Sequence, residues 1–312
     1  MIAVNQITKR YGKITAIADI SFTIEKGQVV GLLGLNGAGK STTMNIIAGC
    51  IRADDGSVII DDIDMAQNPK AAKCKIGYLP EIPPLYQDMK VLEYLNFVYE
   101  LKRVKEPQKE HILACTTMVG LEMMLPRLIR NLSKGYKQRV GFAAALIGNP
   151  EVLILDEPTV GLDPRQMIEI RSLIEELGHT KTVILSSHIL TEVQAVCERI
   201  IIINKGQVIA DNTSKQLEKE MMRDVEYAIS VWGDETKALR CLQSIAGISN
   251  IKIIDREKEE VLFSICGAGE AVVRKEIAKC LVKAGLSITA MLPVEISLED
   301  VFLKLVTQGG QL

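Results

Sequence analysis

Residues 34–42 read GLNGAGKST, and this stretch decides the fold. It follows an apolar run, Val29 to Leu33, and precedes apolar residues at helical spacing, so the expected order is strand, phosphate loop and helix. Glycines let backbone N–H groups converge on a phosphate without obstruction by a Cβ atom, and the helix N-terminus adds favourable partial charge. Lys40 can reach the β- and γ-phosphates, and Ser41 can bind Mg²⁺. The stretch therefore predicts a site for a nucleoside triphosphate.

Composition indicates a globular protein of about two domains. The chain has 312 residues, of which 47% are apolar and 24% are charged. Residues 1–220 hold 26 basic and 26 acidic side chains, and the remainder holds 11 and 13. Because neither part has the excess positive charge that a nucleic-acid backbone attracts, we expect no nucleic-acid partner.

The cysteine spacing and the absence of long apolar runs indicate the cellular compartment in which the chain resides. The seven cysteines include no C-x-x-C pair and no nearby histidine at metal-binding spacing, which is typical of reduced thiols in the cytosol. The N-terminus lacks the apolar segment of a signal peptide, and nowhere do eighteen apolar residues run together. We therefore expect a chain that is not exported and does not cross a membrane.

Apolar, β-branched segments alternate with helical ones after the phosphate loop. This alternation predicts an α/β fold with a mainly parallel sheet, helices on both faces and a β-rich N-terminal subdomain. Between about residues 89 and 147 the pattern becomes helical, which predicts a helical insertion. The predicted strands cover residues 2–8, 20–24, 29–33, 57–60, 75–78, 152–155, 182–186 and 200–204.

The pattern changes after residue 220, which predicts a nucleotide-binding domain over 1–220 and a second domain over 221–312. The second segment has the order β-α-β-β-α-β of a ferredoxin-like α+β unit, followed by a terminal helix. Because this fold serves many unrelated roles, we expect an accessory domain for packing or dimerisation. The predicted strands cover 225–231, 248–254, 260–265 and 287–292, and the helices cover 235–244, 271–284 and 298–305.

Two carboxylates, Asp156 and Glu157, follow the apolar run 152–155. A buried strand there delivers Asp156 to a Mg²⁺ ion bound at Ser41 and leaves Glu157 to accept a proton from an attacking water. The pattern therefore predicts hydrolysis of the bound triphosphate.

His188 follows a second apolar run, 183–187, and should emerge at the same edge of the sheet as Glu157. A histidine there can hydrogen-bond the γ-phosphate or the attacking water. His111 and His179 lie in polar helical surroundings, and we expect them to be solvated surface groups.

Residues 131–139 read NLSKGYKQR and precede an apolar helical run, 140–147. Here the sequence resembles the ATP-binding subunit of ABC transporters, whose signature L-S-G-G-Q stands just before a helix. The resemblance covers residues 2 to about 220. In the family's order it includes Tyr11, the phosphate loop, a Gln-loop at 76–81, the signature, the Asp-Glu strand, the G-L-D loop at 161–163 and His188.

The resemblance implies an ATPase that binds ATP and Mg²⁺. Tyr11 would stack on the adenine, Glu157 would be the general base, and His188 would sense the γ-phosphate. Ser41 and Asp156 would hold Mg²⁺. Lys40 would act in catalysis by binding phosphate. The ATP-binding residues of the loop would be Gly34, Asn36, Gly37, Ala38, Gly39, Lys40, Ser41 and Thr42.

The family relationship also implies an assembly. Two subunits, identical or different, would meet head to tail, so that Ser133, Lys134 and Gly135 complete the partner's ATP site and Asp163 lies at the interface. Separate integral-membrane permease subunits would bind around residues 81–99, with the segment 83–86 as the candidate contact. The chain would then lie in the cytoplasm, peripherally on the inner face of the cell membrane.

Two residues depart from the family pattern. Glu81 stands where the Gln-loop usually has glutamine, and it still offers an oxygen to Mg²⁺ or water; Lys134 replaces a signature glycine. Both variants are similar to those of the exporter branch related to drug, antibiotic and bacteriocin export and to gliding-motility ATPases. The resemblance therefore implies export.

Two other functions stay open at this stage. One is a soluble ABC-type ATPase for assembly or nucleic-acid transactions, although no second ATPase cassette, coiled coil or basic extension is present. The other is a regulatory module that binds ATP with little turnover, which only Glu81 and Lys134 suggest. The transported substrate cannot be read from this chain, because the membrane subunits would select it.

Overall fold

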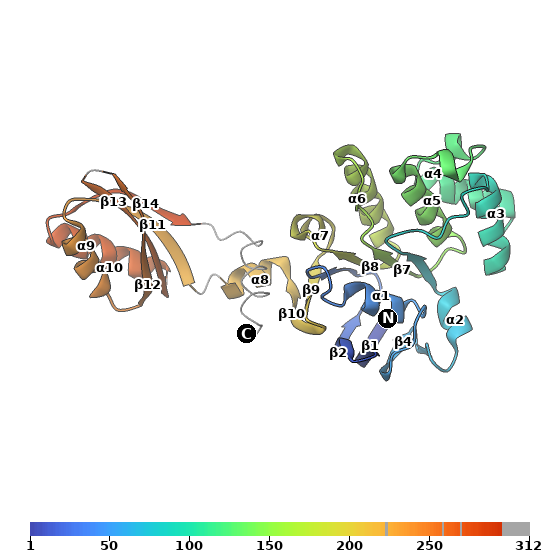
Figure 1. Ribbon diagram of the computed structural model, residues 1–312, viewed down its shortest axis with the longest axis horizontal. Coiled ribbons are helices and arrows are strands. Elements are labelled where there is room, and N and C mark those ends of the chain that lie inside the picture. Colours follow the sequence, from blue (N-terminus) through green and yellow to red (C-terminus); the bar gives the residue numbers. More distant parts are fainter. Residues whose placement is uncertain (222–223, 258, 269, 295–312) are drawn as a thin grey trace. The chain divides into compact units, whose positions relative to one another are not determined.

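The computed structural model describes residues 1–221, 224–257, 259–268 and 270–294. Its backbone divides into two compact units, with the division between Ser214 and Lys215 (Figure 1). The first unit contains the phosphate loop, and the second contains the predicted ferredoxin-like segment.

A six-stranded sheet with the order β10-β9-β3-β8-β7-β6 forms the centre of the first unit. Its inner strands are buried on both faces, which explains why their sequences are continuous apolar runs. All neighbours pair in parallel except β10, which is antiparallel to β9. The strands are β3 (Val29–Leu33), β6 (Ile76–Leu79), β7 (Val152–Asp156), β8 (Thr182–Ser187), β9 (Arg199–Asn204) and β10 (Gln207–Thr213).

The helices α1 (Lys40–Ile47) and α7 (Leu190–Val196) cover opposite faces of this sheet. On one face, Val30 and Leu32 of β3 share a core with α1. On the other face, Gly31 lies so close to α7 that an added Cβ would be 2.0 Å from Cγ1 of Val193. Because side chains alternate along a strand, neighbouring residues at its end also point to opposite faces. Further helices of the first unit are α2 (Pro69–Cys74) and α6 (Pro164–Gly178), and α8 (Ser214–Met221) begins at the division between the units.

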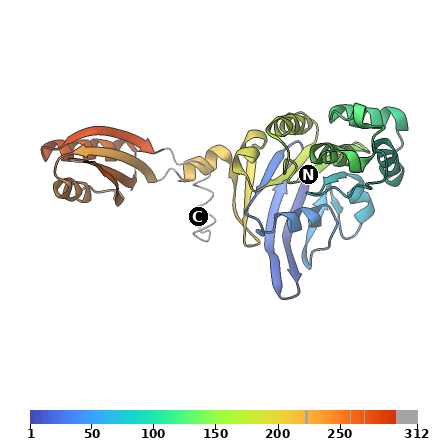
Figure 2. The ribbon, with the colours of Figure 1, turned by 45° about the horizontal axis from the view of Figure 1, so that its top comes forward.

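A second, antiparallel sheet with the order β2-β1-β4-β5 packs on the α1 side. Its apolar side chains, among them Ile2, Ile20 and Ile60, are fully buried in one core with Met44 of α1. In Figure 2 its long blue strands extend away from the green helices. The strands are β1 (Ile2–Tyr11), β2 (Ile14–Ile24), β4 (Asp55–Ile60) and β5 (Ile63–Asp64), so the predicted β-rich N-terminal subdomain is confirmed.

The predicted helical insertion lies between β6 and β7 and packs α3, α4 and α5 on one another. Tyr94, Leu95 and Val98 of α3 are buried, as are Ile112 of α4 and Phe142 of α5. The elements are α3 (Val91–Lys102), α4 (Gln108–Met118), α5 (Lys134–Leu146) and two short 3₁₀ turns, Glu122–Met124 and Ile129–Asn131.

In the part of the second unit from residue 224 to residue 294 that the structure describes, a four-stranded antiparallel sheet with the order β12-β13-β11-β14 carries the helices α9 and α10. Tyr227 and Phe263 share a core with Leu242 of α9 and Leu281 of α10, so both helices cover the same face. This is the predicted β-α-β-β-α-β order, while the predicted helix 298–305 lies outside the described residues. The elements are β11 (Asp224–Trp232), α9 (Glu235–Gln243), β12 (Ile248–Glu257), β13 (Glu260–Ala268), α10 (Glu270–Lys283) and β14 (Ser287–Val294).

The prediction of a solvated His111 is wrong. The residue is 8% exposed, and its ring lies beside Tyr99. Its Nε2 accepts the backbone N–H of Gly148 at 2.9 Å, and its Nδ1 contacts the Glu106 carboxylate, so the imidazole ties α4 to the end of α5. His179 is exposed, as predicted.

We expect His111→Ala to lower the free energy of unfolding of the first unit by about 1–3 kcal/mol, because it leaves the Gly148 N–H without its acceptor and opens a cavity. Urea unfolding measures the change. His179→Ala is the matched control, and we expect it to lie within about 0.5 kcal/mol of the wild type. Equal losses in the two variants would contradict a structural role for His111.

Candidate active site

The phosphate loop joins β3 to α1 through backbone that only glycine adopts without strain. Gly37 and Gly39 have φ values of 80° and 111°. A Cβ on Gly39 would lie 2.7 Å from Cγ2 of Ile17 and 3.0 Å from the carbonyl oxygen of Ala16. Gly39 is the N-cap of α1 and offers no side chain to the N–H groups of the first turn, so these donors can take an anion.

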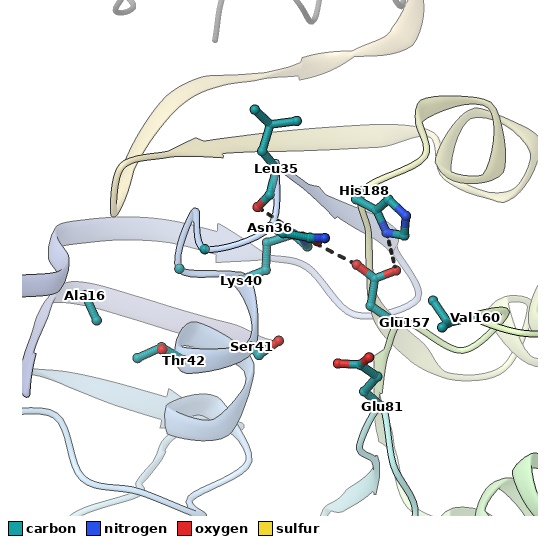
Figure 3. A pocket seen from close by; sticks show the side chains of 12 residues that line it. Ala16, Leu35, Asn36, Lys40, Ser41, Thr42, Glu81, Glu157, Val160 and His188 are labelled. Atoms are coloured by element: carbon teal, nitrogen blue, oxygen red, sulfur yellow. Dashed lines mark hydrogen bonds and ion pairs between the residues drawn. The ribbon is translucent and has the colours of Figure 1, made fainter.

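A cavity of about 490 Å³ opens over this loop (Figure 3). It brings together the predicted loop residues and the predicted Glu81, Glu157 and His188, which come from the ends of β6, β7 and β8. This convergence follows from the parallel sheet, because the carboxyl ends of parallel strands meet at one edge. The cavity is lined by Ala16, Leu35, Asn36, Gly37, Gly39, Lys40, Ser41, Thr42, Glu81, Glu157, Val160 and His188.

Three predicted ATP-binding residues do not line the cavity. Gly34 lies at its base, where its carbonyl oxygen accepts the Lys40 ammonium at 2.8 Å, and Ala38 is buried in the core beside α1. Tyr11, at the end of β1, is 51% exposed, and its ring has Lys9 Nζ at 5.8 Å from the centroid. An exposed aromatic ring is free to stack on a base.

Lys40, Glu157 and His188 form a continuous chain of charged and polar groups across the cavity (Figure 3). Lys40 Nζ lies 3.4 Å from one carboxylate oxygen of Glu157, and His188 Nδ1 lies 3.0 Å from the other. The Lys40 and Glu157 side chains are only 6% and 7% exposed. Burial lowers the local dielectric constant and so strengthens the attraction between the two charges.

The Mg²⁺ ligands expected from the sequence lie together. Ser41 Oγ is 3.3 Å from Oδ1 of the buried Asp156, and Ser186 Oγ donates to the same oxygen at 2.6 Å. A hydroxyl and one fixed carboxylate suit an ion that takes its other ligands from phosphate and water. Glu81 is exposed, and Figure 3 shows it on the opposite wall from Ser41, below Glu157. The oxygen donors therefore fit Mg²⁺.

The signature residues lie at the start of α5, outside the set of residues that line this cavity. Ser133 is the N-cap, and its Oγ accepts the Tyr136 N–H at 3.4 Å. Ser133 and Lys134 are exposed, whereas Gly135 is buried so closely against Gln166 that an added Cβ would lie 2.3 Å from its Oε1. The chain does not bring its own signature to its own phosphate loop.

Asp163 is exposed and caps α6, since its Oδ1 accepts the Gln166 N–H at 2.9 Å. The loop before it packs against the signature, because a Cβ on Gly161 would lie 2.1 Å from Lys134 Nζ. The predicted interface residue and the predicted signature therefore lie next to each other within the chain.

Sequence reasoning missed a buried group behind the site. Glu192 on α7 is 5% exposed and accepts hydroxyl hydrogen bonds from Thr159 and Ser187, which flank the catalytic candidates in the chain. The only sequence signal is an acidic residue one helical turn after His188, which a surface helix also shows.

Comparisons with known proteins agree with this geometry. The family model of the ABC transporter matches residues 17–160. The linearmycin resistance ATP-binding protein LnrL of Bacillus subtilis is 35% identical over 82% of this chain and 83% of its own length. The bacitracin transport ATP-binding protein BcrA of Enterococcus faecalis is 32% identical over 99% of this chain and 97% of its own length.

The solved dimeric structure of a bacterial ABC transporter cassette is also similar, with a TM-score of 0.64 and 30% identity over 68% of this chain and 98% of that one. The chain therefore belongs to the ABC transporter family as an ATP-binding subunit. It is an ATPase, and its hydrolysis of ATP is coupled to transport. Within the described ranges, every helix is too short or too little apolar to cross a membrane.

We expect Gly39→Ala to weaken ATP binding at least about 10-fold, because the new Cβ meets Ile17 and Ala16 and distorts the backbone that faces the phosphates. A fluorescent ATP analogue titrated into the purified chain measures the affinity. The matched control is Gly27→Ala, whose φ of 78° is also positive but whose Cβ meets nothing within 4 Å. Unchanged affinity in a folded Gly39→Ala variant would contradict the assignment of the loop.

Proposed function

We propose that this chain hydrolyses ATP to drive separate membrane-spanning subunits in the export of an antibiotic peptide. The carrying observation is the similarity to the bacitracin transport protein of Enterococcus faecalis, which extends over 99% of this chain and so includes the second unit as well as the ATPase core. In this proposal residues 1–220 bind ATP and residues 221–312 form an accessory domain.

The chemistry is hydrolysis of the terminal phosphate of ATP. The loop N–H groups and Lys40 bind the phosphates, and Glu157 takes a proton from the attacking water, with His188 beside its second oxygen. Ser41 and Asp156 would hold Mg²⁺, with Glu81 as a further oxygen donor, and the ion would neutralise charge on the phosphates. Tyr11 would stack on the adenine.

Two ATPase subunits would close head to tail around two ATP molecules. Support comes from the exposure of Ser133 and Lys134 at the start of α5, away from the chain's own cavity. A helix N-terminus attracts an anion, so a second subunit would present this end to the γ-phosphate. Gly135 and Asp163 would lie in the same interface, because both pack beside Gln166.

An apolar patch formed by Tyr86 and Phe97, in the chain between β6 and β7, supports a membrane partner. Ile82, Tyr86, Phe97 and Leu101 are 81%, 54%, 40% and 69% exposed. The centroids of the Tyr86 and Phe97 rings lie 5.6 Å apart, and the rings meet edge to face and form an exposed aromatic surface. The proposed occupant is an apolar helical segment from the cytoplasmic side of a permease subunit.

A cavity of about 450 Å³ lies in the same region, lined largely by apolar groups that include Pro83, Pro84, Tyr94 and Val98. It contains part of the segment 83–86 that the sequence suggested as a contact. Binding there would hold the chain peripherally on the inner face of the cell membrane.

Expressed with its membrane subunits, the chain should raise the tolerance of a sensitive bacterium to a peptide antibiotic, and Glu157→Gln should abolish that gain. The same variant should lower the steady-state ATPase rate by about 10²–10⁴-fold, because it removes the general base. Minimum inhibitory concentrations and phosphate release are the two measurements.

The control is Glu198→Gln, which changes an exposed glutamate on the same unit. Equal ATPase rates for wild type and Glu157→Gln would exclude Glu157 as the base. A wild type without turnover beside its membrane subunits would favour the regulatory module, and binding to DNA or RNA at physiological salt would favour the nucleic-acid ATPase.

The double variant Tyr86→Ala, Phe97→Ala should reduce recovery of the membrane subunits with the affinity-tagged chain by at least about 10-fold, because it removes most of the aromatic surface. Co-purification in mild detergent measures the recovery. Leu113→Ala removes a side chain that is 51% exposed on α4, outside the patch, and should leave recovery unchanged. Equal recovery with both variants would exclude this patch as the contact.

A further inference from the structure

Glu192 is a buried carboxylate that the hydrolysis chemistry does not use. It lies on α7 and is 5% exposed. Its Oε2 accepts the hydroxyl of Thr159 at 2.6 Å and the hydroxyl of Ser187 at 3.1 Å. A buried charge is costly unless its hydrogen bonds are made, so a carboxylate in this place needs a reason.

The two hydroxyls belong to the segments that carry the reacting groups. Thr159 stands two residues after Glu157, and Ser187 immediately precedes His188. Ser187 Oγ also accepts a hydrogen bond from the Ile189 N–H at 3.0 Å. The hydroxyl proton of Ser187 is donated to Glu192. One carboxylate oxygen therefore ties the chain that follows β7 to the chain that follows β8.

A second connection lies on the other face of the sheet. Ser186 Oγ donates to Asp156 at 2.6 Å and accepts the N–H of Glu157 at 2.9 Å. Because Ser186 and Ser187 are neighbours in β8, their hydroxyls point to opposite faces. The ends of the two strands are thus joined on both faces, by Ser186 on one and by Glu192 on the other.

The backbone of Glu157 explains why two connections are needed. Its φ is 48°, a left-handed conformation that a residue with a Cβ adopts only when its surroundings impose it. Ser186 Oγ accepts the N–H of this residue, and the Thr159 hydroxyl, two residues later, is anchored on Glu192. Together they fix the direction in which the Glu157 carboxylate points.

Arg171 on α6 supplies the neighbouring positive charge. Its NH2 lies 3.8 Å from Oε1 of Glu192, which is longer than a hydrogen bond, and its buried Nε has no acceptor among the described residues. The two hydroxyls, and not the guanidinium, therefore set the position of the Glu192 carboxylate.

We propose that Glu192 is a positioning residue for ATP hydrolysis: it fixes the Glu157 and His188 segments relative to each other by holding Thr159 and Ser187. The inference rests on the proposed role of Glu157 as general base. It concerns the rate of the chemical step and leaves the phosphate-binding loop untouched, since Glu192 does not line the cavity.

The test is steady-state ATPase activity of the full chain, with kcat and KM for ATP measured separately. In Glu192→Ala we expect kcat to fall by about 10–100-fold, because a misplaced base costs about that much. We expect KM to change by less than about threefold, because a loss confined to the transition state appears in kcat. Glu198→Ala is the matched control, because Glu198 is an exposed glutamate. We expect this variant to have wild-type kcat and KM.

A double-mutant cycle separates positioning from general destabilisation. Thr159→Val alone should lower kcat by about 2–10-fold. The double variant with Glu192→Ala should be about as slow as Glu192→Ala alone, because the hydrogen bond between Thr159 and Glu192 is already absent in Glu192→Ala. If Glu192→Ala does not fold, the single variants Thr159→Val and Ser187→Ala carry the test, each with lowered kcat and unchanged KM.

Three results would overturn the inference: a folded Glu192→Ala variant with wild-type kcat, a rise in KM without a fall in kcat, or additive losses in the cycle. The failures are distinguishable. A fully active Glu157→Gln variant removes the proposed role of Glu157 as the general base, whereas an inactive Glu157→Gln beside a fully active Glu192→Ala removes only the role of Glu192.

Discussion

The ion pair between Lys40 and Glu157 is the constraint on which the site depends. Both side chains are almost fully buried and 3.4 Å apart, so each is the main counter-charge of the other. Removing either partner would leave a charge without compensation in a region of low dielectric constant. His188 Nδ1 lies 3.0 Å from the other carboxylate oxygen of Glu157, so the three side chains form one connected set. The positions of the phosphate-loop lysine and of the carboxylate that follows β7 are therefore coupled.

That pair works only because the backbone around it is fixed. Lys40 is placed by glycines whose positive φ values no other residue adopts cheaply, and Glu157 is itself left-handed at φ 48°. The hydroxyls of Ser186 and Ser187 on opposite faces of β8 hold the second of these conformations. The strained residue thus stands where two strand ends are already cross-linked, which explains how the strain persists.

The sequence predicted the groups that follow from chain geometry and missed those that depend on packing. Lys40, Asp156, Glu157 and His188 were predictable because each ends or follows a buried parallel strand, and such ends meet at one edge. Glu192 and His111 were not, because a polar side chain on a short amphipathic helix looks the same whether it faces solvent or a buried hydroxyl. The strand β10 was missed for a related reason, since its sequence, QVIADNT, has only a short apolar run and two polar ends.

The unusual signature residue makes sense only together with the loop that it touches. The Lys134 side chain occupies the space that a Cβ atom on residue 161 would need, and residue 161 has a φ of 72°. A glycine at 161 and a long side chain at 134 therefore fit together. Gln166, in the first turn of α6, fills the equivalent space beside Gly135. The N-terminal ends of α5 and α6 are therefore packed on each other through glycine positions that leave no free volume. Close-packed contacts transmit displacement, so the signature and the Asp163 loop should move as one body.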